Sequence, residues 1–199
     1  SPTAVLTNGG AVNIVTGCVT AVGGVYDAHD TITYTDCPGA IEYGPVTPDP
    51  YADVAAPPGA CTSTSYYSQF PNQGSGSIRC YTGSSGNVSL AGNGTTTLAP
   101  NVTYVFENTN ATNASNFTLN GGRTLSGTNV TLYFKGKWAV SINGNSQINI
   151  TAPTSGTYSG IALFGDRESD VDMDLSGNNL GKIVGAVYSP NSESLVTAT

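Results

Sequence analysis

The chain has 199 residues, of which only 10% are Asp, Glu, Lys or Arg, and its formal net charge is −7. Glycine, serine, threonine and asparagine dominate, which favours strands and tight turns over amphipathic helices, since those need charged faces. The few basic residues are scattered, which excludes nucleic-acid binding, and no apolar stretch approaches the roughly 18 residues that cross a bilayer.

The first part of the sequence predicts short strands, over residues 12–15, 19–25 and 31–34, followed by a proline-rich segment over 44–60. Its prolines exclude a central strand, because proline cannot donate a ladder hydrogen bond. We expect 44–60 to run extended over the surface of a single β-solenoid domain, 1–199, between an N-terminal set of coils and a C-terminal set. A flexible interdomain linker is the alternative.

From Val88 onward one short pattern recurs, in which two apolar residues flank a polar one and a polar residue and a glycine follow. It occurs at residues 88–92, 117–121, 140–144 and 173–177. The four glycines lie 29, 23 and 33 residues apart. This spacing is typical of a solenoid that keeps its strands in register and lets its turns vary in length.

Further stretches, 102–106, 130–134 and 148–150, alternate with the period of two that is expected of strands with one buried face. Each coil therefore carries at least two strands, and successive coils must stack to share one core. Glycine and asparagine supply left-handed corners, where stacked asparagines can hydrogen-bond between coils. The predicted fold is all-β, a right-handed parallel β-helix with an irregular N-terminal part.

The four cysteines form two equally spaced pairs. Cys18 and Cys37 are 19 positions apart in the sequence, and so are Cys61 and Cys80. Residues one coil apart stack at about 4.8 Å, within the Cα separation that a disulfide tolerates. The predicted bridges are Cys18–Cys37 and Cys61–Cys80. Free cysteines in a reducing compartment are the alternative, whereas a zinc site lacks a CxxC pair and a second histidine.

Several stretches resemble the extracellular regions of bacterial Tad-type (Flp) pilus-assembly proteins, the TadG-like group. They are residues 47–57, 98–104, 127–134, 142–167 and 185–191, and the most specific is the Thr151-Ala-Pro-Thr-Ser-Gly run that leads to Asp166-Arg167. Such relatives are tethered by an N-terminal membrane helix, which we do not expect here. The resemblance implies a role in or beside a surface appendage, and it does not imply any chemical activity.

We therefore expect a non-catalytic structural or adhesive protein, extracellular or at the cell surface. Its expected partners are other copies of itself or pilus and surface components, with no nucleic acid and no membrane insertion. The alternative is a carbohydrate-active enzyme or a glycan-binding module. Parallel β-helices host lyases and hydrolases, which need clustered acids, and the repeats contain the adjacent acid–base pair Asp166–Arg167.

No catalytic residue is assigned from the sequence. His29 lies between Asp27 and Asp30 without an accompanying serine or cysteine motif, so we expect a surface histidine. No cofactor is expected other than Ca²⁺, which the acidic run 166–174 could bind through its carboxylate oxygens. The candidate ligands are Asp166, Glu168 and Asp170, and the alternative is a solvated turn that protects a strand edge.

Three aromatic residues, Tyr66, Tyr67 and Phe70, are candidates for partner binding. If they are exposed, they can stack on sugar rings or anchor a protein partner. Packing of their loop onto the coils is the alternative.

Overall fold

The structure, a computed structural model, describes residues 3–7, 14–27, 30, 32–46, 48–57, 66–72, 76–84, 86–177, 181–191 and 194–198. Within these ranges the regular elements are parallel β-strands and one short 3-10 helix, η1 (Tyr67–Gln69). The chain divides into two compact units, which we describe separately. Unit 1 is Ser1–Asp53 with Thr197–Thr199, and unit 2 is Val54–Val196. The boundary falls inside the proline-rich segment 44–60.

Unit 1 is a short stack of two coils. Strand β1 (Thr3–Thr7) pairs with β3 (Gly24–Asp27), and β2 (Ile14–Thr16) pairs with β4 (Ile32–Tyr34). A bridge between Thr20 and Ile41 continues the stacking beyond the strands. Where residues are described, the predicted strands over 12–15 and 31–34 correspond to β2 and β4, while residues 12, 13 and 31 lie outside the described ranges. Of the 19–25 run, only residues 24 and 25 belong to a strand.

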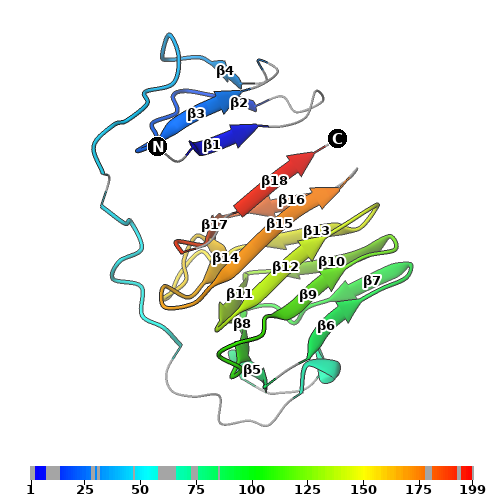
Figure 1. The fold of residues 1–199 in the computed structure, drawn as a ribbon. Helices are drawn as coiled ribbons and strands as arrows, with labels where there is room; N and C mark the ends of the chain where they lie inside the picture. The colour runs from blue at the N-terminus through cyan, green and yellow to red at the C-terminus, as the bar shows by residue number, and fades with distance from the viewer. Residues whose placement is uncertain are drawn as a thin grey trace. The chain divides into compact units, whose positions relative to one another are not determined.

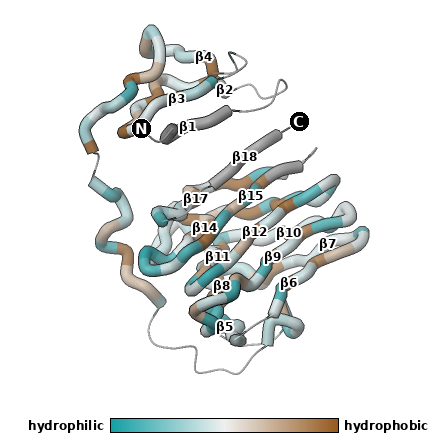
Figure 2. The backbone as a smooth tube through the Cα atoms, viewed as in Figure 1, coloured by the Kyte–Doolittle hydropathy of each residue, from teal (hydrophilic) through white to brown (hydrophobic). Residues whose placement is uncertain are grey.

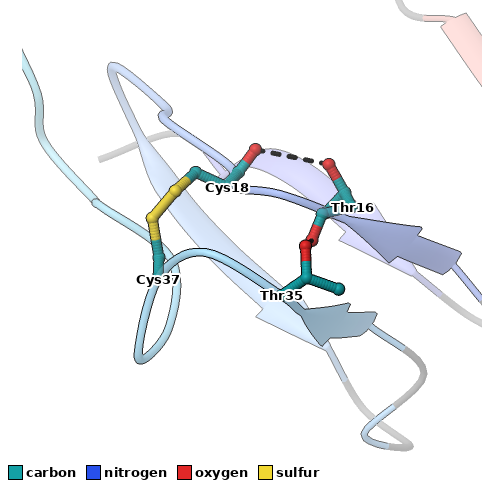
Figure 3. The surroundings of a disulfide bond; sticks show 4 residues. All are labelled: Thr16, Cys18, Thr35 and Cys37. Atoms are coloured by element: carbon teal, nitrogen blue, oxygen red, sulfur yellow. Dashed lines mark hydrogen bonds between the residues drawn. A yellow bond between two sulfur atoms is a disulfide. The ribbon is translucent and has the colours of Figure 1, made fainter.

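The predicted Cys18–Cys37 disulfide is confirmed (Figure 3). It joins the two coils of unit 1, and its Cα atoms lie 5.4 Å apart, close to the spacing of stacked strands. Nearby, the Thr35 hydroxyl donates to the carbonyl oxygen of Thr16 on the other coil at 3.3 Å. Cys61 lies outside the described residues, so the Cys61–Cys80 bridge stays a prediction.

Unit 2 contains three parallel sheets, which the chain visits in turn (Figure 1). Sheet 1 consists of β5 (Ile78–Gly83), β8 (Val102–Asn108), β11 (Val130–Lys135), β14 (Ile161–Gly165) and β17 (Ala186–Tyr188). Sheet 2 consists of β6 (Asn87–Leu90), β9 (Ser115–Leu119), β12 (Trp138–Ile142), β15 (Val171–Gly177) and β18 (Ser194–Ala198), of which residues 194–196 belong to unit 2. Sheet 3 consists of β7 (Gly94–Thr97), β10 (Arg123–Thr128), β13 (Gln147–Thr151) and β16 (Gly181–Val184). This confirms the predicted parallel β-helix, with three strands in a full coil.

The repeated sequence pattern forms sheet 2. Its strands pair so that the first apolar residue of each repeat lies in one ladder, which runs Val88, Phe117, Val140, Met173. The second apolar residue forms the next ladder, which runs Leu90, Leu119, Ile142, Leu175. Both ladders line the interior, since their members are buried or packed against the core. The irregular spacing of the glycines therefore leaves the strand register unchanged.

The corners of the coils are left-handed, as predicted. Gly92, Gly121 and Gly144 follow three strands of sheet 2 with φ of 77°, 71° and 66°. Asn101 and Asn129 precede β8 and β11 with φ of 60° and 55°, and Nδ2 of Asn129 donates to Oδ1 of Asn101 at 3.1 Å. The predicted hydrogen bonding between stacked corner asparagines is present at this position.

Aromatic rings fill the interior beside sheet 1. Tyr81, Phe106 and Phe134 occupy successive strands, and their rings stack with centroids 5.7 Å and 5.1 Å apart. Phe117 and Trp138 of sheet 2 meet Phe106 at 5.2 Å and 6.0 Å in edge-on contacts. Neighbouring coils are therefore held together by ring contacts as well as by backbone hydrogen bonds.

Two of the three aromatic residues considered for partner binding are buried. Tyr67 and Phe70 are 6% and 7% exposed. Phe70 makes edge-on contacts with rings of the first coils, including Phe106 at 5.1 Å, and the Tyr67 hydroxyl donates to the Glu107 carbonyl oxygen at 2.6 Å. For these two residues the structure shows the alternative, packing of the loop onto the coils, because they cover the interior of the first coil, β5 to β7, which water would otherwise reach. Tyr66 is 66% exposed, and its role in binding stays a prediction.

Candidate functional site

The outer face of sheet 1 carries a second aromatic stack. Tyr133, Phe164 and Tyr188 lie in register on β11, β14 and β17, with ring centroids 5.1 Å and 4.7 Å apart. Tyr158 packs edge-on against Tyr133 at 5.8 Å, and the Arg167 guanidinium lies 5.6 Å from the Phe164 and Tyr188 rings. The prediction that β8 and β11 bury one face is therefore wrong, since both faces of these strands are covered.

Residues 54 and 55, which belong to the proline-rich segment 44–60, contact this stack. The Tyr158 hydroxyl donates to the carbonyl oxygen of Ala55 at 3.0 Å, and Nη1 of Arg167 donates to that of Val54 at 3.0 Å. These contacts join positions more than a hundred residues apart in the sequence. Residues 54 and 55 therefore lie against sheet 1 of unit 2, and the course of the whole segment 44–60 stays a prediction.

Asp166, the first candidate calcium ligand, is held inside the protein. Its Oδ2 accepts a short hydrogen bond from the Tyr133 hydroxyl. Its Oδ1 accepts from the Glu168 backbone N–H at 2.9 Å and from the Ser169 hydroxyl at 3.3 Å. Both carboxylate oxygens are thus used by the chain itself, and they fix the turn before β15 and tie it to sheet 1.

The other two candidate ligands, Glu168 and Asp170, are exposed in the same turn, which Figure 2 shows in teal before β15. The three candidate ligands therefore do not lie together on one strand face, because β15 begins only at Val171. The alternate carboxylates that β15 does carry are those of Asp172 and Asp174. Within the described ranges, no group of three or more His, Cys, Asp or Glu residues could hold a metal ion. This part of the chain therefore contains no assembled set of calcium ligands.

A groove of about 480 Å³ runs beside the turn. Its charged lining residues are Glu107, Lys135, Asp166, Arg167 and Glu168. Lys135 and Glu107 form an ion pair at 2.9 Å between neighbouring strands, and Arg167 is stacked on aromatic rings. Most of the charges are therefore engaged in contacts that hold coils together. The groove thus brings together Asp166, Arg167 and Glu168. His29, which the sequence suggested as a surface histidine, lies outside the described residues.

Burial changes the acidity of two tyrosines at this site. Burial, and then the hydrogen bond to Asp166, raise the pKa of Tyr133 far above its usual value. Burial, and then the charge of Asp166, raise the pKa of Tyr158 to about 12. Both hydroxyls consequently remain protonated hydrogen-bond donors near neutral pH, and neither can act there as a general base.

The raised tyrosine pKa values predict a loss of stability in alkali. An unfolded tyrosine ionises near pH 10. Because the folded protein holds these protons more tightly, the stabilisation is complete below about pH 10 and is lost as the pH rises towards 12. Urea unfolding at several pH values should show this decline, and Tyr158→Phe should make it shallower. Tyr66→Phe, at an exposed tyrosine, is the control, and an equal change in that variant would contradict the prediction.

Comparison with protein-family models, with curated proteins and with solved structures found no match. In the described part of the chain no helix is long and apolar enough to cross a membrane. The outer aromatic stack has a signal in the sequence that the period of two does not capture. Adjacent large apolar residues, as in Tyr133-Phe134 and Leu163-Phe164, indicate a strand that is buried on both faces.

Proposed function

We propose that this chain is a non-catalytic structural or adhesive protein of a bacterial surface appendage, whose solenoid acts as a rigid element attached through one end. The observation that carries the proposal is the difference between the two ends of unit 2. At the first coil, Tyr67 and Phe70 cover the interior. At the last strands of sheets 1 and 3, β17 and β16, interior positions remain partly exposed.

Val187 illustrates the open end. It pairs with Leu163, which is fully buried, and so continues an interior ladder, but it is itself 36% exposed. Ile183 of β16 continues the ladder of Ile150 and is partly buried. Within unit 2, β17 and β16 are the last strands of their sheets, so their outer backbone N–H and C=O groups have no partner strand in the sheet and can pair with a strand of another molecule. This end therefore has both the apolar surface and the hydrogen-bonding groups that a further coil needs.

The location of the protein is part of the proposal. The Cys18–Cys37 disulfide favours an oxidising compartment, since such bonds persist outside the cytosol. The resemblance of residues 47–191 to TadG-like proteins supports a surface appendage in particular. The proposed partner at the open end is a second copy of the chain or another appendage component.

Sedimentation velocity over a range of concentrations tests the attachment. We expect wild-type protein to self-associate through the open end and Val187→Lys to weaken association at least tenfold, because a charge there cannot be buried. Ile78→Lys is a matched control, since Ile78 lies on β5 at the covered end and is 38% exposed. A strictly monomeric wild type, or equal loss in both variants, would count against the proposal.

A further inference from the structure

A second pocket, of about 310 Å³, lies where the corner before β8 and β11 faces the loop 153–158. It shares no lining residue with the charged groove. Asn101 and Asn129 line one side with Val102 and Ile78, and Tyr158 lines the other side together with the loop. Residues 153–156 of this loop belong to the run 151–156, which is the most specific part of the family resemblance in the sequence.

The pocket has no charged side chain in its lining, which consists of amide, hydroxyl and apolar groups. A charged ligand would lose water there without gaining an opposite charge, and this is costly. A neutral ligand with several hydroxyl groups can exchange its hydrogen bonds to water for bonds to such a lining. The lining therefore favours a polar, uncharged ligand.

Several polar atoms of the lining are available for a ligand. The bond from Asn129 Nδ2 to Asn101 Oδ1 leaves Oδ1 of Asn129 and Nδ2 of Asn101 without a partner among the described residues. The side chains of Thr154, Ser155 and Thr157 belong to exposed residues, and their hydroxyls likewise make no hydrogen bond within the described part of the chain. The pocket thus offers acceptors and donors on two facing sides.

The loop is held in place before any ligand arrives. The Gly160 N–H donates to the Pro153 carbonyl oxygen at 2.7 Å and closes the loop at its base. The Tyr158 ring packs on Phe164, and its hydroxyl is bonded to Ala55. A site that is already ordered loses little conformational entropy on binding.

We infer that this pocket binds a neutral saccharide unit. A sugar ring presents hydroxyls around its edge and an apolar C–H face, which match the amide and hydroxyl groups of the lining and the exposed apolar surface of Ile78. The inference goes beyond the proposed attachment through the open end, and it concerns a lateral surface. Either proposal can therefore fail without the other.

Titration of ¹⁵N-labelled protein with methyl glycosides tests the inference. The neutral probes are the methyl glycosides of glucose, galactose, mannose and N-acetylglucosamine, and the charged probes are those of glucuronic acid and sialic acid. We expect at least one neutral probe to shift the amide resonances of Asn101, Asn129 and residues 154–158, and the charged probes to leave them unchanged. No shift from any neutral probe, or equal shifts from charged ones, would overturn the inference.

Two variants remove the polar groups without changing charge. The triple variant Thr154→Val, Ser155→Ala, Thr157→Val deletes the loop hydroxyls, and Asn101→Gly deletes the amide while glycine accepts the left-handed φ. Each is expected to weaken binding at least tenfold. Asn116→Ala is the control, because Asn116 forms a similar pair with Asn87 on sheet 2 and should leave binding unchanged. Wild-type affinity in the triple variant would contradict the assignment even if Asn101→Gly failed to fold.

Discussion

Replacing Phe106 with alanine is expected to lower the free energy of unfolding of unit 2 by about 3–5 kcal/mol. Phe106 is fully buried, and its ring contacts rings of the coils on both sides, Tyr81 at 5.7 Å and Phe134 at 5.1 Å. Phe70, which covers the first coil, also packs on it at 5.1 Å. The substitution would thus leave a cavity where the end cover meets two coils, and urea denaturation would measure the loss.

The matched control is Tyr66→Ala, which also removes an aromatic ring but from a residue that is 66% exposed. Its effect should stay within about 0.5 kcal/mol, as is usual for surface substitutions. If Phe106→Ala cost no more than Tyr66→Ala, the shared interior of the coils would not be the main source of stability. A similar m-value in both variants would show that each still unfolds in the same cooperative transition.

Removal of the Cys18–Cys37 disulfide is expected to destabilise unit 1 by about 3 kcal/mol, the value typical of a closed loop of this size. Where the burial of unit 1 side chains is described, which leaves out β1, the buried apolar residues are Ala21 and Ile32, whereas Val15, Tyr26 and Tyr43 are exposed. We therefore expect unit 1 to depend on the bond. Two coils bury too little apolar surface to be stable by themselves.

Hydrogen exchange in the double variant Cys18→Ser, Cys37→Ser would measure this effect. Amides of β2 and β4 should exchange faster by about two orders of magnitude, which corresponds to about 3 kcal/mol. Amides of β11 and β12 in unit 2 serve as the internal control and should keep their protection. Unchanged exchange in β2 and β4 would show that the disulfide contributes little to the stability of unit 1.

The sequence by itself determined four strands of sheet 2, β6, β9, β12 and β15, together with their register and the Cys18–Cys37 bridge. These features depend on local pattern: alternation decides which residues face inward, and residues one coil apart must stack. The pairing of Val88 with Phe117, Val140 and Met173 follows from the pattern although the turns between them differ in length. Glycine and asparagine at the corners were predictable for the same reason, because few other residues adopt a left-handed φ.

Only the tertiary structure decided three of the four strands of sheet 3, since β7, for example, reads Gly-Thr-Thr-Thr and has no apolar alternation. The fourth, β13, was predicted by the alternation at 148–150. It also decided which aromatic residues are exposed. Tyr67 and Phe70 are buried because the first coil has an uncovered interior, and Asp166 is engaged because Tyr133, on another coil, reaches it. The neutral pocket joins Asn101, Asn129 and the loop 153–158, which are distant in sequence. Such contacts depend on how coils with turns of unequal length lie over one another, and the composition of a single segment does not contain that information.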